Sequence, residues 1–132
     1  MNDRGQEFGC EHCWPAAAEA AWLARGALKE INTLFDESHF HVMILECPRC
    51  TQHFVSIFSE TIDWAEGDDP QYWQLLPITE TEAVNLLEQG NSLTETTLET
   101  LGPGRRSLHR DYPSGAAPHV FWSTGISIGF HD

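Results

Sequence analysis

The sequence predicts an α+β fold, in which an antiparallel sheet is accompanied by a long N-terminal helix. Three observations lead to this class. An apolar stripe at three-and-four spacing runs through residues 15–35 and predicts a helix, because residues with this spacing share one helix face. Strand-forming runs on both sides of residues 47–50 predict a β-hairpin. Similar runs over residues 106–112 and 119–124 predict a second hairpin.

We expect a single domain over residues 1–132, with residues 1–9 as a flexible lead-in. A hydrophobic share of 41% is ordinary for a globular protein, and five tryptophans with seven phenylalanines supply large side chains for a core. No apolar run reaches the roughly 20 residues that a membrane helix needs. No basic segment leads into an apolar one near Met1. These features predict a cytoplasmic protein without a membrane span.

The first half of the chain is expected to form the long helix and then a three-stranded meander. Pro15 suits the first helical position, because proline lacks the N–H that would be unpaired there, and the helix is expected to end near Phe35. The first hairpin follows. A third strand is predicted over residues 71–78, after a turn at residues 66–70 that is rich in Gly, Asp and Pro.

The second half is expected to contain two short helices and the C-terminal hairpin. The Thr-Glu-Thr-Glu run from Thr79 fits a capping box, which predicts a helix over residues 80–89 that stops at the following glycine. Ser92 with Glu95 predicts a cap for another short helix. The aromatic-rich second arm of the hairpin, residues 119–124, is expected to enter the main sheet.

The four cysteines fall into two C-x-x-C pairs, and this pattern predicts a metal site. One tight turn can present two thiolates to the same ion, and zinc prefers four ligands in a tetrahedron. Two disulfides are the alternative, but a cytoplasmic location favours reduced thiols. A site closed by four thiolates leaves no position for substrate or water, so a structural role is expected for the zinc. The predicted ligands are Cys10, Cys13, Cys47 and Cys50.

The two pairs resemble the knuckles of zinc ribbons, in which a C-x-x-C turn joins two strands. The resemblance covers residues 10–13 and 47–50 with the hairpin around them, a minor part of the chain. It implies a structural zinc site and says little about activity. Zinc ribbons of the smallest kind have no helix of about twenty residues between their knuckles, whereas this chain is expected to have one.

Rubredoxins are similar in the same two motifs, and they hold iron. Their knuckles usually carry a glycine directly after each pair, where this chain has Trp14 and Thr51. Iron is therefore the minor alternative to zinc. His12 and His53 lie within or just beyond the motifs, and whether either joins the metal shell is left open by the sequence.

The strongly negative net charge restricts which binding partners we expect for this protein. The formal net charge is −13, and four thiolates with one Zn²⁺ would take it to −15. Such a protein repels phosphate backbones, so nucleic acid is not an expected partner. Residues 50–104 contain acids but no lysine or arginine. A solvated acidic face is the plainer interpretation. The functional interpretation is that the protein is a protein–protein interaction module, whose acidic surface binds a basic or mixed-charge protein.

A hypothesis of a different class is catalysis at the second hairpin. His109, Asp111 and His119, placed across its two arms, could form an acid–base pair in a hydrolase or transferase. No nucleophile or phosphate-loop motif accompanies them. The sequence therefore favours a binding protein over an enzyme.

Overall fold

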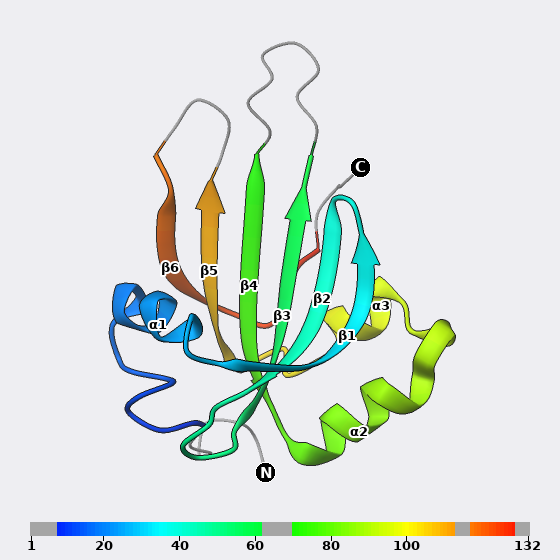
Figure 1. Ribbon diagram of the computed structural model, residues 1–132. Helices are drawn as coiled ribbons and strands as arrows, with labels where there is room; N and C mark the ends of the chain where they lie inside the picture. Colours follow the sequence, from blue (N-terminus) through cyan, green and yellow to red (C-terminus); the bar gives the residue numbers. More distant parts are fainter. Residues whose placement is uncertain (1–7, 62–69, 113–116, 129–132) are drawn as a thin grey trace.

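The computed structural model describes residues 8–61, 70–112 and 117–128. Within them the chain forms a six-stranded antiparallel sheet, and each strand pairs with the next along the chain (Figure 1). The strands are β1 (Lys29–Glu37), β2 (Phe40–Glu46), β3 (His53–Glu60), β4 (Gln71–Ile78), β5 (Arg106–Tyr112) and β6 (His119–Thr124). The helices are α1 (Ala18–Arg25), α2 (Glu80–Gln89) and α3 (Glu95–Glu99), with a 3₁₀ turn, η2 (Gly90–Ser92).

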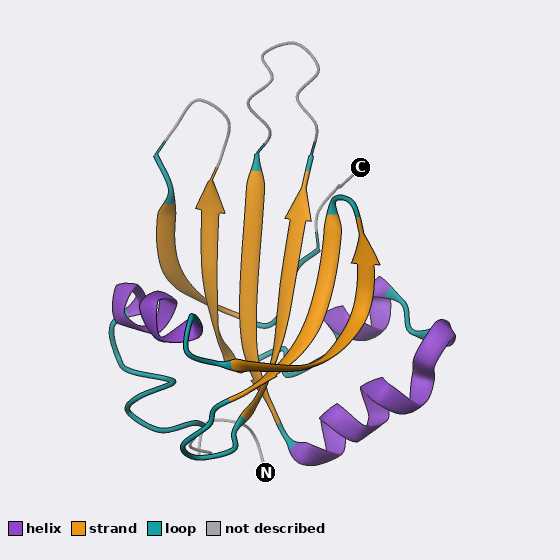
Figure 2. Ribbon diagram, in the orientation of Figure 1, coloured by secondary structure: helices purple, strands orange, loops and turns teal. Residues whose placement is uncertain are grey.

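The fold class is therefore largely β, and the prediction of an α+β fold with a long N-terminal helix is wrong. Figure 2 shows how strands dominate the molecule, while the helices are short. Of residues 15–35, only α1 is helical, and its C-cap is Gly26. Glycine is costly inside a helix because it loses more backbone freedom than other residues on folding. The strand β1 begins at Lys29, within the predicted helix.

β1 departs twice from the regular pairing of an antiparallel strand. The register of β1 against β2 shifts between Glu30 and Asn32 and again between Thr33 and Phe35. The extra residues are Ile31 and Leu34, so apolar positions recur at a spacing of three. Such bulges also bend a strand, and β1 is strongly bent (Figure 1).

The other predicted strands are confirmed. β2, β3 and β4 form the expected meander, and the pairing of Glu46 with His53 leaves residues 47–52 as the connection between β2 and β3. β5 and β6 are the two arms of the predicted C-terminal hairpin. It is β5 that pairs with β4, while β6 lies at the sheet edge. The turn predicted at residues 66–70 falls mostly outside the described residues.

The capping box is also confirmed. The Thr79 hydroxyl accepts a hydrogen bond from the Glu82 N–H at 3.1 Å, and the Glu82 carboxylate accepts one from the Thr79 N–H at 2.8 Å. α2 ends at Gly90 as expected. The cap of α3 is Thr94, not Ser92, which lies in η2.

The two faces of the sheet bury separate apolar clusters, because successive side chains along a strand point to opposite faces. On one face, Val42, Ile44, Val55, Ile57 and Leu76 of the sheet cluster with Leu86 of α2 and Leu98 of α3. The other face packs on Trp14 and α1 and includes Ala21, Leu45, Phe54, Leu75 and Leu108. α1 lies against β5 and β6 (Figure 1).

No described helix combines the length and apolar character that crossing a bilayer requires. The single domain and the cytoplasmic location stay predictions.

Candidate metal centre

The first cysteine pair lies in a tight turn before α1. The N–H groups of Cys13 and Trp14 donate to the Cys10 carbonyl at 3.2 and 2.8 Å. The Cys10 N–H donates to Cys13 Sγ at 3.2 Å. Gly9 precedes the turn with a φ of +69°, and a Cβ at this position would lie 2.8 Å from Cys13 Sγ. Only glycine fits this position without a shift of the turn.

The second pair lies in the connection between β2 and β3. The Thr51 N–H donates to the Cys47 carbonyl at 3.0 Å, and the Cys47 N–H donates to the Gln52 carbonyl at 2.9 Å. The Arg49 N–H donates to Cys47 Sγ at 3.4 Å. Thr51 has a φ of +65°, in the left-handed region that favours glycine. Thr51 therefore holds a backbone conformation that glycine adopts at lower cost.

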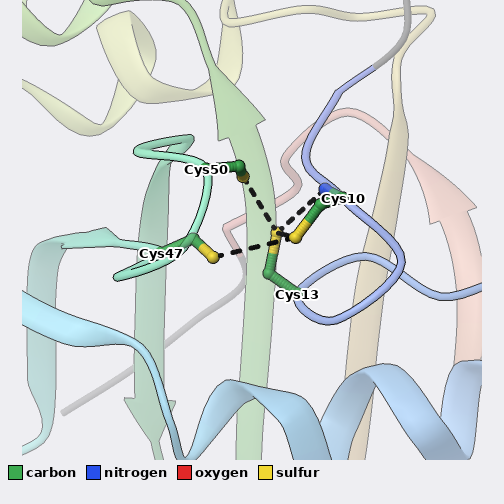
Figure 3. Close-up of side chains that lie close together, drawn as sticks. All are labelled: Cys10, Cys13, Cys47 and Cys50. Atoms are coloured by element: carbon green, nitrogen blue, oxygen red, sulfur yellow. Dashed lines mark hydrogen bonds between the residues drawn. The ribbon is translucent and has the colours of Figure 1, made fainter.

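The four sulfur atoms converge on one point (Figure 3). Cys10 Sγ lies 3.7 Å from Cys13 Sγ and 3.9 Å from Cys47 Sγ, and Cys13 Sγ lies 3.7 Å from Cys50 Sγ. All four lie within 4.8 Å of one another. Sulfur atoms at about 2.3 Å from a central zinc, in a tetrahedron, are about 3.8 Å apart. A disulfide needs about 2.05 Å, so the cluster consists of free thiols that could hold a metal ion.

The protonation of these thiols differs with their surroundings. A backbone hydrogen bond from Cys13 lowers the pKa of Cys10 to about 7, whereas burial raises the pKa of Cys13 and of Cys50. Cys13 and Cys47 are each only 2% exposed. A buried thiolate is unfavourable unless a positive charge lies beside it. A metal cation between the sulfurs would supply that charge.

Aromatic contacts hold the first turn against the sheet. The ring of Trp14 lies 5.3 Å from that of Phe54 and 4.9 Å from that of Trp122, measured between centroids. The indole N–H of Trp122 donates to the Ala16 carbonyl at 2.9 Å. The guanidinium of Arg106 lies over the Trp122 ring, 3.9 Å from its centroid. The residue after the first cysteine pair is therefore part of the core.

Gln52 links the two turns directly, a role that the sequence analysis missed. Its side-chain oxygen accepts from the Gly9 N–H at 2.9 Å. Its amide nitrogen donates to the carbonyls of His53 and Ile78, each at 2.8 Å. Gly9 was missed as well. The sequence places each of these residues beside a cysteine motif, Gly9 before the first and Gln52 two residues after the second.

The histidines near the motifs do not join the cluster. The His53 ring lies 3.3 Å from the Glu46 carboxylate, across the β2–β3 pair. The His12 side chain is 53% exposed and lies 4.0 Å from that of Glu11. In the part of the chain that the structure describes, only the four cysteines gather as potential metal ligands.

No family model, no curated protein and no solved structure matches the chain. The four-cysteine cluster is compatible with a zinc-ribbon-like site.

The residues of the catalytic hypothesis lie on one face of the sheet. Asp111 pairs in register with His119 across β5 and β6. His109 and Asp111 both line a cavity of about 600 Å³, and His119 is not among its lining residues. Ser107 Oγ lies 2.8 Å from His109 Nε2, but Ser107 is fully buried. Its hydroxyl is therefore closed to a substrate.

Proposed function

We propose that Cys10, Cys13, Cys47 and Cys50 bind one Zn²⁺, and that this ion has a structural role. The observation that carries the proposal is the convergence of the four sulfur atoms: three of their separations are 3.7 to 3.9 Å and all lie within 4.8 Å, close to the spacing in a tetrahedron of thiolates around zinc. Four thiolates occupy all positions of the ion. The zinc would then stabilise the fold and would not meet a substrate.

The ion would cross-link two distant parts of the chain. Cys10 and Cys13 belong to the segment before α1, and Cys47 and Cys50 belong to the β2–β3 connection (Figure 3). The segment also carries Trp14, which packs on β3 and β6. Because the site forms only when both turns are in place, zinc binding is coupled to folding.

The Cys47→Ser variant tests this role. Cys47 is buried, and its loss leaves three thiolates. We expect weaker zinc binding and a free energy of unfolding that is lower by at least about 2 kcal/mol in the presence of zinc. Chemical unfolding followed by tryptophan fluorescence, with metal content measured beside it, gives both quantities.

The control is the same comparison after zinc has been removed with a chelator. The unchanged protein and Cys47→Ser should then have nearly equal stability, because the ion is absent from both. A stability difference that chelation leaves unchanged would show that Cys47 acts through packing alone, and the structural-zinc proposal would fail.

We also propose that the protein acts by binding another protein that is basic or of mixed charge. Support comes from α2, where Val84 and Leu87 are 46% and 42% exposed. Glu80 and Glu88 are exposed on the same helix. An apolar pair beside carboxylates is a surface that a basic, partly apolar segment would fit. The catalytic hypothesis stays a prediction.

A further inference from the structure

The cavity of about 600 Å³ lies on the sheet face opposite Trp14 and the cysteine cluster. Its lining residues on β4 and β5 alternate with Leu75 and Leu108, which face Trp14. Cavities of this size are typical of small-molecule sites. The cavity is therefore a feature separate from the metal centre.

The strand register builds the cavity wall from two adjacent rows. Ser59, Tyr72 and Asp111 are neighbours across β3, β4 and β5. Gln74, His109 and Phe121 form the next row across β4, β5 and β6. All six line the cavity. Side chains on a regular sheet have fixed relative positions, so the polar and aromatic groups are pre-arranged.

The C-terminal segment closes one side of the cavity. The Gln74 amide nitrogen donates to the Ser127 carbonyl at 2.7 Å, and its oxygen accepts from the Ser127 N–H at 2.9 Å. These two hydrogen bonds satisfy the buried amide. Gln74 thus holds Ser127 at the cavity wall.

Among the described residues that line the cavity, Asp111 is the one carboxylate. Its carboxylate makes no ion pair and no hydrogen bond within the described part of the chain. Burial lowers the pKa of His109, so this ring is neutral at pH 7. Neither lysine nor arginine is among the described residues that line the cavity. The local charge therefore favours a cation, as does the net charge of the whole protein.

An organic cation fits the lining better than a metal ion does. A metal site needs several ligand groups, and among the described residues only the cysteines gather in such a group. Tyr72 and Phe121 supply aromatic rings, which attract cations through their π faces. The Phe121 ring is held in place by stacking on His109 and His119, at centroid distances of 5.4 and 4.9 Å.

We infer that this cavity binds a small planar organic cation of the amidine, guanidine or aromatic ammonium class. Asp111 is the counter-ion, and it forms charge-assisted hydrogen bonds to the N–H groups of the ligand. Tyr72 and Phe121 pack against its planar part, and the Ser59 hydroxyl is available to a further N–H. This site is independent of zinc binding.

The test uses three probes of nearly equal size that differ in charge, namely benzamidine, benzamide and benzoate. Titration of the zinc-loaded protein is followed by NMR. We expect saturable binding of benzamidine with a dissociation constant on the order of 1 mM or tighter, weaker binding of benzamide and none of benzoate. Asp111→Asn should weaken benzamidine binding by about 10- to 100-fold.

Asp36→Asn is the matched control, because it removes the same charge from an exposed side chain on β1. It should leave benzamidine binding unchanged. The melting temperature of each variant verifies that it is folded. No saturable binding of benzamidine, equal or tighter binding of benzoate, or equal losses in the two variants would each overturn the inference.

Discussion

Two individual residues, Gly9 and Gln52, position the first cysteine pair. Gly9 combines a positive φ with a close approach to Cys13 Sγ, and its N–H is bound by the Gln52 side chain. The four cysteines could be predicted because their spacing is a local pattern. These two supporting residues could not, since their roles depend on a contact between segments 43 residues apart.

Gly9→Ala is predicted to damage the site without removing a ligand. The added Cβ would lie 2.8 Å from Cys13 Sγ and 2.8 Å from Trp14 Cβ, in a backbone conformation that alanine adopts at a cost. We expect the free energy of unfolding to fall by about 2 kcal/mol and zinc affinity to fall with it. Urea unfolding and competition with a chelator measure these effects.

The control for this substitution is Gly104→Ala. A Cβ at Gly104 meets nothing within 4 Å, and its φ is not positive. This variant should therefore keep both stability and zinc affinity. If Gly9→Ala behaved in the same way, the close packing of Gly9 against the cysteine turn would have no energetic consequence.

Among the elements, local patterns predicted several strands and one helix correctly, but not the fold class. The meander of β2, β3 and β4 and the capping box of α2 follow from residues close in sequence. The failure came in residues 15–35, where the spacing of apolar residues suits a helix but Gly26 ends α1 early. The two bulges of β1 arise from pairing with β2, which a single segment does not reveal.

The exposed face of α2 makes the partner proposal testable. A fluorescent helical peptide of lysine and leucine should bind the protein, and a peptide with glutamate in place of lysine should not. Leu87→Ser should weaken binding about tenfold, because apolar area at the contact is lost. Fluorescence anisotropy at two salt concentrations measures the affinity and its electrostatic part.

Leu23→Ser is the matched control, since Leu23 is 78% exposed on a different helix, α1. Its binding should equal that of the unchanged protein. Absence of saturable binding, or equal losses for Leu87→Ser and Leu23→Ser, would argue against α2 as the partner surface.

At the scale of the whole molecule, the sheet separates two sites. The cysteine cluster and Trp14 lie towards one face, and the cavity with Asp111 lies on the other. The metal centre joins the N-terminal turn to the connection between β2 and β3, and the cavity depends on the register of β3 to β6. The six-stranded sheet thus provides a rigid support for both.

The whole fold is proposed to be anchored by one zinc ion, bound through the four thiolates of this chain. Elemental analysis of the purified, untagged protein, combined with thiol titration before and after chelation, tests it most directly. We predict one zinc per chain, with four thiols that react only after the metal is removed or the protein is unfolded. A protein without bound metal, or one whose cysteines are paired as disulfides, would contradict the claim.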